Sequence, residues 1–81
     1  NSFTLFYMKK TGINIGEIIH QELDKRERSV AWLADKIGCH RTTMSRMLEK
    51  YSIDSEVLFQ ISYVLDVDYH ALYCQKLKDR A

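Results

Sequence analysis

Apolar residues recur every three or four positions after residue 13, which is the spacing of amphipathic helices. β-Branched runs are short and the chain contains no proline, so no residue forces a break inside a helix-length stretch. Polar breaks divide the pattern into five stretches, which are expected to begin near residues 15, 30, 40, 55 and 69. The pattern therefore predicts an all-α fold of five short helices.

Residues that favour helix ends stand at the predicted boundaries. Side-chain oxygens that can accept hydrogen bonds from the first N–H groups of a helix precede four of the stretches, at Asn14, Ser29, Asp54 and Asp68. Gly38 follows the second stretch, where a residue that tolerates positive φ commonly ends a helix. Local chemistry and periodicity therefore predict the same boundaries.

Each predicted helix has one apolar face, and these faces are expected to form a single core. The inward residues are predicted to be Ile15, Ile18, Ile19 and Leu23, then Leu33, Ala34 and Ile37, then Met44, Met47 and Leu48, then Val57, Leu58, Ile61 and Leu65, and finally Leu72, Tyr73 and Leu77. The rings of Tyr63, Tyr69 and Tyr73 could form a dimer surface, but they are interpreted first as packed rings with their hydroxyls at the rim. The expected architecture is a five-helix bundle over residues 14–81.

Residues 1–13 do not fit a helix. Phe3, Leu5 and Tyr7 alternate with their neighbours in a weakly strand-like pattern, and residues 9–12 have the composition of a linker. Two interpretations stay open, a disordered tail or a non-helical N-terminal arm that pairs with its copy in a dimer. The chain begins with asparagine rather than methionine, so added foreign residues, processing and an arbitrary boundary also stay open as explanations of this segment.

Composition places the chain among ordinary water-soluble domains, with 46% hydrophobic and 28% charged residues. No apolar run reaches the roughly 18 residues that a membrane span requires, and the patch at residues 3–8 is too short for a signal-peptide core. Two cysteines are too few for a disulfide framework, so Cys39 and Cys74 are interpreted as reduced thiols. We expect a cytoplasmic protein with no membrane partner.

The formal net charge is +1, but basic and acidic residues are unevenly distributed along the chain. Residues 25–50 contain seven basic and three acidic side chains, whereas the rest of the chain contains five basic and eight acidic ones. Positive charge gathered on one part of a small domain is typical of proteins that bind nucleic acid. The basic segment coincides with the second and third predicted helices.

Residues 30–49 carry the most informative pattern. Ala34 lies four positions before Gly38, where the second and third helices should approach most closely and where a larger side chain would force them apart. Only about three residues separate the two helices, and Met44 and Met47 supply apolar contacts on the third. This combination predicts two helices that cross steeply, with the polar side of the third facing outward.

This stretch resembles the helix-turn-helix of the phage repressor and Cro family of DNA-binding domains. The resemblance rests on small and apolar residues at the packing positions of that motif, namely Leu33, Ala34, Ile37, Gly38, Cys39, Met44 and Met47. It covers about residues 14–73, because residues 53–72 are similar to the family's closing helices. It implies a bacterial or phage transcription regulator, commonly a homodimer, with no enzymatic activity in the domain.

Carried over residue by residue, the resemblance assigns base reading in the major groove of double-stranded DNA to Arg41, Thr42, Ser45 and Arg46. Arginine can donate two hydrogen bonds to guanine, and threonine offers a hydroxyl and a methyl group. Contacts with the DNA backbone are assigned to Arg28, Ser29, Lys36, His40, Thr43 and Lys50. A two-fold pair would read half-sites about one helical turn apart.

A second class of function stays open, a protein-interaction module that keeps this scaffold without binding DNA. Three features favour it: Val30 stands where the family often has glutamine, Glu49 follows Arg46 by one helical turn, and the net charge is small. Such a module would use an apolar face, for example at Trp32, although Trp32 is interpreted first as a partly buried ring that closes the core.

An enzyme is the least favoured class. No Ser-His-Asp or Cys-His arrangement has a catalytic spacing, and there is no glycine-rich loop to hold a phosphate. His70 and Cys74 share a helix face, and Cys39 and His40 add a sulfur and a nitrogen, but Cys39 is expected in the core and no Cys-x-x-Cys is present, whereas structural zinc usually needs four closed ligands. We expect no catalytic residues, no metal, no cofactor and no small-molecule substrate.

Overall fold

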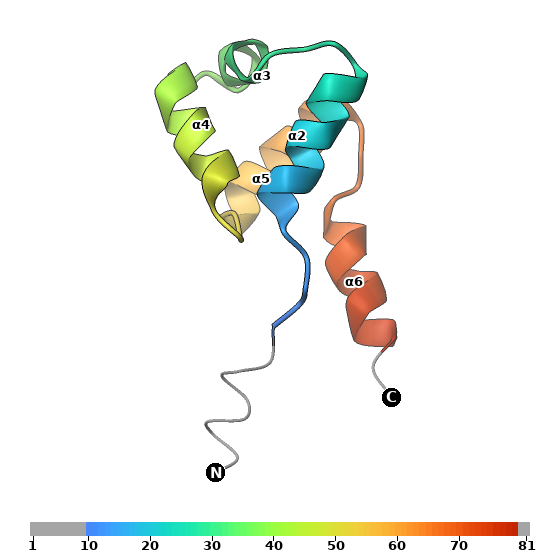
Figure 1. Cartoon of the computed structure of the whole chain (residues 1–81). Coiled ribbons are helices and arrows are strands. Elements are labelled where there is room, and N and C mark those ends of the chain that lie inside the picture. The colour runs from blue at the N-terminus through green and yellow to red at the C-terminus, as the bar shows by residue number, and fades with distance from the viewer. Residues whose placement is uncertain (1–9, 80–81) are drawn as a thin grey trace.

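A computed structural model describes residues 10–79, which form five helices and contain no strand within that range. The helices are α2 (Ile15–Lys25), α3 (Val30–Ile37), α4 (Arg41–Glu49), α5 (Ser55–Leu65) and α6 (His70–Lys78) (Figure 1). The predicted all-α fold is confirmed, and the helices begin within about one residue of the expected positions. The predicted N-terminal arm lies mostly outside the described residues, and residues 10–13 form neither helix nor strand.

The predicted caps close the helix ends by side-chain hydrogen bonds. Four oxygens accept from backbone N–H groups: Asn14 Oδ1 from Glu17 at 3.4 Å, Ser29 Oγ from Trp32 at 3.0 Å, Asp54 Oδ1 from Glu56 at 2.9 Å and Asp68 Oδ1 from Ala71 at 3.1 Å. Each bond satisfies a donor that the helix itself leaves free. The cap residues therefore fix where the chain enters α2, α3 and α5, whereas Asp68 lies one residue before Tyr69, the N-cap of α6.

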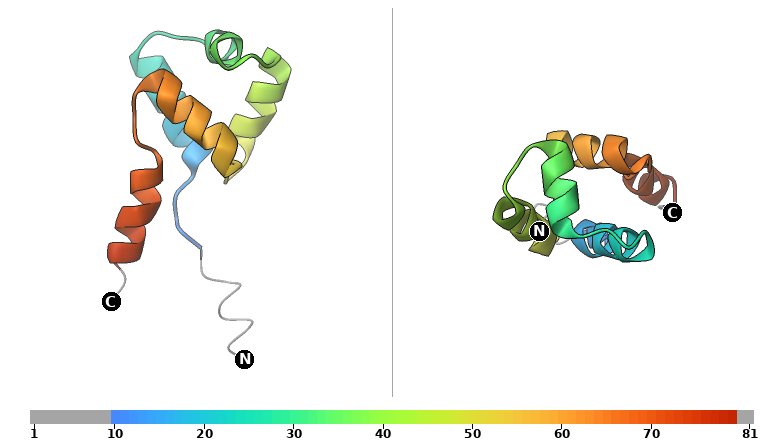
Figure 2. Two further views of the ribbon diagram at one scale, coloured as in Figure 1. Left: turned by 180° about the vertical axis from the view of Figure 1, so that it is seen from behind. Right: turned by 90° about the horizontal axis from the view of Figure 1, so that it is seen from above.

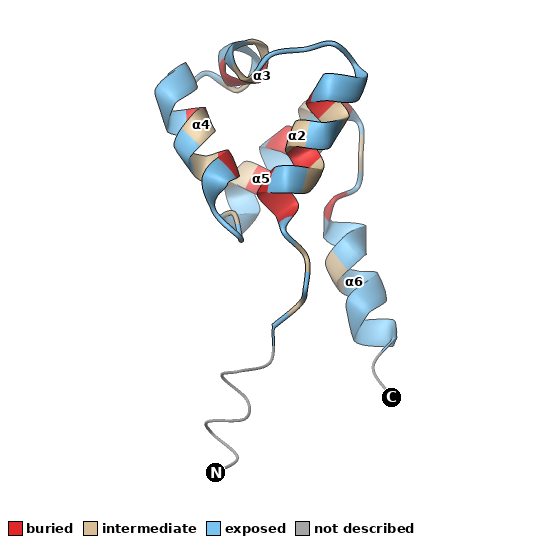
Figure 3. Ribbon diagram, viewed as in Figure 1, coloured by how far each residue is buried: buried red, intermediate tan, exposed pale blue. Residues whose placement is uncertain are grey.

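The core lies where α2, α4 and α5 converge beneath α3. In Figure 2, the view from above shows α3 crossing over the space between the other three helices. Figure 3 shows their buried sides facing one another. The buried residues are Ile15, Ile19, Leu23, Leu33, Ala34, Met44, Leu48, Leu58, Ile61, Leu65 and Tyr69. The apolar faces predicted for the first four helices supply ten of these eleven residues, so the core was largely predictable.

The apolar side predicted for the fifth helix is confirmed only at Tyr73, which is half-buried against the core, and it is wrong at Leu72 and Leu77. No residue of α6 is buried, and Leu72 and Leu77 are exposed (Figure 3). Instead Tyr69, in the turn before α6, occupies the core. The physical reason is the direction of α6, which leaves the bundle after this turn and runs beyond it (Figure 1).

Two contacts join α2 to distant parts of the chain. Gly16 faces the backbone of Leu48 so closely that a methyl group at Gly16 would lie 1.9 Å from the Leu48 carbonyl oxygen. At the other end of α2, the Arg26 guanidinium donates to the Leu65 carbonyl oxygen at 2.6 Å, and it pairs with Glu22 at 2.6 Å. These contacts hold α2 against the ends of α4 and α5.

No helix in residues 10–79 is long and apolar enough to cross a membrane.

Candidate nucleic-acid interface

The link between α3 and α4 consists of residues 38–40 and begins with a left-handed glycine. Gly38 has φ of 93° and ψ of 30°, a conformation that costs glycine little and other residues about 1 to 2 kcal/mol. The N–H groups of Gly38 and Cys39 both donate to the Ala34 carbonyl oxygen, at 2.8 and 3.0 Å. The turn therefore satisfies the end of α3 while redirecting the chain into α4.

The small side chain of Ala34 is buried where α3 meets the other helices. Figure 1 views α3 almost end-on while α4 is seen from the side, so the two helices cross steeply. Met44, on α4, is completely buried, and Met47 and Cys39 are half-buried against the core. The predicted packing of this pair is therefore present, and it fixes which side of α4 faces outward.

The outward side of α4 is polar and basic. Arg41, Thr42, Thr43 and Arg46 are exposed, and Ser45 is half-buried, whereas Met44 and Leu48 on the other side are buried. The four side chains predicted to read bases therefore lie on the solvent side of one helix. Arginine and hydroxyl side chains can form hydrogen bonds with the base edges displayed in a major groove.

The beginnings of α3 and α4 open into one shallow hollow. It is lined by Ser29, Val30 and Ala31 from the start of α3 and by Arg41, Thr42 and Ser45 from α4. Helix N-termini carry partial positive charge, so two of them beside one hollow favour an anion there. The hollow thus brings three predicted base-reading residues together with one predicted backbone contact, Ser29.

The guanidinium groups of α4 have no acidic partner among residues 10–79. Within that range the one ion pair joins Arg26 to Glu22, so neither Arg41 nor Arg46 is neutralised by contact with a carboxylate. Glu49, which follows Arg46 by one turn, is exposed and makes no such contact. Both arginines therefore remain able to donate to an external acceptor.

His40, which by sequence is a poorer cap than serine or threonine, nevertheless caps α4. Its Nδ1 accepts a hydrogen bond from the Thr42 N–H at 3.1 Å, so the imidazole is the N-cap of α4. Because Nδ1 is the acceptor, the neutral ring carries its proton on Nε2. The exposed ring can therefore cap the helix and still donate from Nε2 to an outside group.

Two predicted backbone contacts, Arg28 and Lys36, lie on a different side of α3. The Arg28 guanidinium lies 5.0 Å from the centre of the Trp32 ring, and the Lys36 ammonium lies 5.9 Å from it. Trp32 is half-buried against the core, as predicted. Lys36 lines a hollow between α3 and α5 rather than the one beside α4.

The remaining predicted contacts are spread along α4. Thr43 is exposed in its first turn, while Lys50 is exposed at the C-cap, the opposite end from the hollow. Sequence reasoning missed Val30 and Ala31 as lining residues. Their position in the first turn of α3, directly after the cap Ser29, was the available signal, because first-turn residues border whatever meets a helix N-terminus.

No family model, curated protein or solved structure matches the chain.

Proposed function

We propose that this chain is a sequence-specific DNA-binding domain of the phage repressor and Cro helix-turn-helix type. It places α4 in the major groove, pairs as a homodimer and regulates transcription in the cytoplasm of a bacterium. The observation that carries the proposal is the division of α4 into a buried apolar side and an exposed side on which Arg41 and Arg46 have no acidic partner.

The roles of the individual residues follow from their positions. Arg41 and Arg46 donate to guanine edges, while the hydroxyls and the methyl group of Thr42 and Ser45 contact neighbouring bases. A phosphate lies at the hollow beside Ser29, where the N-termini of α3 and α4 meet. The cations at Arg28 and Lys50 add to the sequence-independent part of the affinity.

Selection of bound duplexes from a random pool tests this proposal and identifies the site. Binding of the full chain to the selected duplex is then measured by fluorescence anisotropy at several salt concentrations. We expect affinity to fall steeply with salt, as counterion release requires. Arg41→Ala and Arg46→Ala should each lose discrimination at a single base pair, by roughly 1 to 3 kcal/mol.

Lys78→Ala is the matched control, because it removes one positive charge from α6 without touching α4. It should retain the base preference of the parent. The proposal fails if no duplex is enriched and no binding occurs at low salt, or if both arginine variants keep the parent's preference at every base pair.

The alternative function is a protein-interaction module, and one observation favours it. Val30 and Ala31 make the α3 side of the hollow apolar, which suits an apolar side chain of a protein partner as well as a sugar–phosphate chain. Absence of DNA binding at low salt, with the fold intact by circular dichroism, would support this alternative.

A further inference from the structure

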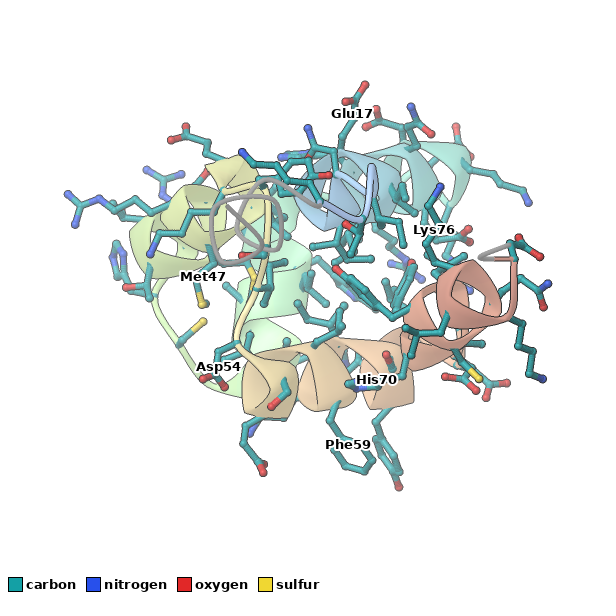
Figure 4. All side chains as sticks on the ribbon, turned by 90° about the horizontal axis from the view of Figure 1, so that it is seen from below. Glu17, Met47, Asp54, Phe59, His70 and Lys76 are labelled. Carbon is teal, nitrogen blue, oxygen red and sulfur yellow. The ribbon has the colours of Figure 1, made fainter. Side chains whose placement is uncertain are left out.

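α5 carries an exposed aromatic ridge on the side away from the core. Phe59 and Tyr63 are 59% and 81% exposed and stand one helical turn apart, opposite the buried Leu58, Ile61 and Leu65. Figure 4 shows Phe59 projecting away from the body of the molecule. Two adjacent large rings in water are typical of a surface that another molecule covers.

A hollow lies on each side of this ridge, and both hollows are lined in part by Phe59 and Tyr63. The hollow on the α3 side is completed by Lys36, Ile37, Gln60 and Val64. The hollow on the α6 side is completed by Ser62, Asp66, Val67, Asp68 and His70. The ridge therefore separates a side with a lysine from a side with two aspartates.

We propose that two copies of this chain pair through the ridge, with α5 of one copy against α5 of the other. The charge pattern is what selects a second copy as the occupant. A two-fold axis along the ridge exchanges its two sides, so the lysine side of each copy faces the aspartate side of the other. Each copy then offers one basic and one acidic contact, and the two contacts are equivalent.

The same pattern sets the relative direction of the helices. An axis along the ridge makes the two α5 helices run parallel, with each Lys36 opposite Asp66 or Asp68 of the other copy. An axis across the ridge makes them antiparallel and brings the two lysine sides together, which like-charge repulsion disfavours. The rings supply the apolar contact, and the charges select the parallel arrangement.

This inference rests on the proposed function only in that both require two copies, and it is tested without DNA. Sedimentation equilibrium of the full chain measures the dimer dissociation constant. Tyr63→Asp should raise that constant about tenfold or more, because it buries a charge among aromatic rings. Leu77→Asp on α6 is the matched control, since Leu77 is similarly exposed at 64%, and it should leave the constant unchanged.

Charge reversal tests the parallel arrangement. Lys36→Glu alone places acidic groups on both sides of the ridge, and Asp66→Lys alone places a lysine on each side. Each variant by itself should have a dimer dissociation constant at least about tenfold higher than that of the parent. An equimolar mixture should regain pairing, because both contacts between the two variants again join opposite charges. Asp66→Asn controls for the fold, because Asp66 has φ of 56° and asparagine also accepts that conformation.

Several outcomes would overturn the inference: a parent chain that stays monomeric, an effect of Leu77→Asp that exceeds that of Tyr63→Asp, or a mixture that pairs no better than its components. Circular dichroism on each variant separates loss of pairing from loss of fold. A chain that pairs through this ridge but binds no DNA would refute the proposed function and leave the inference standing. A monomer that binds DNA would refute the inference and the homodimer of the proposed function, and would leave only the DNA-binding role of α4 standing.

Discussion

Gly16 and Leu48 approach so closely that the first turn of α2 rests directly on the backbone of the last turn of α4. A Cβ on Gly16 would lie 1.9 Å from the Leu48 carbonyl oxygen, 2.7 Å from its carbonyl carbon and 3.0 Å from the Lys50 carbonyl oxygen. These are backbone atoms, so no side-chain rotation can relieve the overlap. The neighbouring Ile15 N–H donates to the Tyr51 carbonyl oxygen at 3.3 Å across the same junction.

Gly16→Ala should therefore destabilise the domain severely. The added methyl group forces α2 and α4 apart at a buried site; overpacking typically costs about 1 to 3 kcal/mol, and an overlap with backbone atoms should reach the upper end of that range. Urea denaturation followed by circular dichroism measures the change in the free energy of unfolding. A variant as stable as the parent would mean that the two helices separate without penalty.

Gly38→Ala should destabilise the domain less than Gly16→Ala, because its cost comes from backbone conformation and not from steric overlap. Nothing lies within 4 Å of a Cβ built on Gly38, so the cost is the left-handed backbone alone, about 1 to 2 kcal/mol. Gly38→Asn should cost less, since asparagine tolerates positive φ. If alanine and asparagine destabilise equally in the same urea experiment, the conformational explanation is wrong.

The contrast between the two glycines shows what the sequence was able to predict. Gly38 follows an apolar stretch at the position of a helix end, so its role can be inferred from local pattern. Gly16 lies inside a helix and is required by Leu48, which is 32 positions away in the sequence. No local pattern records that requirement, because it depends on how α2 and α4 cross.

The candidate site likewise has a part that the sequence predicts and a part that it does not. The exposed side of α4 followed from the apolar positions Met44 and Leu48 on its other side, and the structure confirms that exposure. The positions of Lys36 and Tyr63 depend on how α5 packs beneath α3, and a one-dimensional pattern does not specify this. Tyr63, interpreted from sequence as packed, is largely exposed, whereas Tyr69 is buried to its hydroxyl.

Tyr69→Phe should leave the domain as stable as the parent at neutral pH, or make it more stable. Tyr69 is 2% exposed, and its hydroxyl has no hydrogen-bond partner among the described residues. Removing an unpaired buried hydroxyl removes a desolvation cost while the ring stays in the core. Thermal unfolding at pH 7 measures the difference. A loss of more than about 1 kcal/mol would indicate a hydrogen bond that this geometry lacks.

The same substitution should change the alkaline stability profile. Burial raises the pKa of Tyr69 above its usual 10.0, Glu22 raises it further, and Arg26 opposes the shift. The unfolded chain therefore loses this proton first, and stability falls as pH rises from about 10 towards the folded-state pKa. Tyr69→Phe should flatten that fall in urea unfolding between about pH 9 and 11.5, and an equally steep fall in the variant would contradict this explanation.

Arg26→Ala should weaken the junction between α2 and α5. In the parent, the Arg26 guanidinium donates hydrogen bonds to the Leu65 carbonyl oxygen at the end of α5 and to the Glu22 carboxylate on α2. Because the side chain is about a third exposed, we expect a loss of about 1 kcal/mol. Arg26→Lys keeps the charge without the two-pronged geometry, so it should recover only part of the loss in urea unfolding.

Substitutions at His40 separate its two roles. His40→Ala removes both the acceptor for the Thr42 N–H and the Nε2 donor, so it should cost about 1 kcal/mol in unfolding and weaken DNA binding. His40→Asn keeps a good N-cap but is too short to reach outward, so it should be as stable as the parent while losing affinity equally for all duplexes. Anisotropy with the selected duplex and a scrambled duplex measures that loss. Unchanged affinity in His40→Asn would show that the imidazole serves only to begin α4.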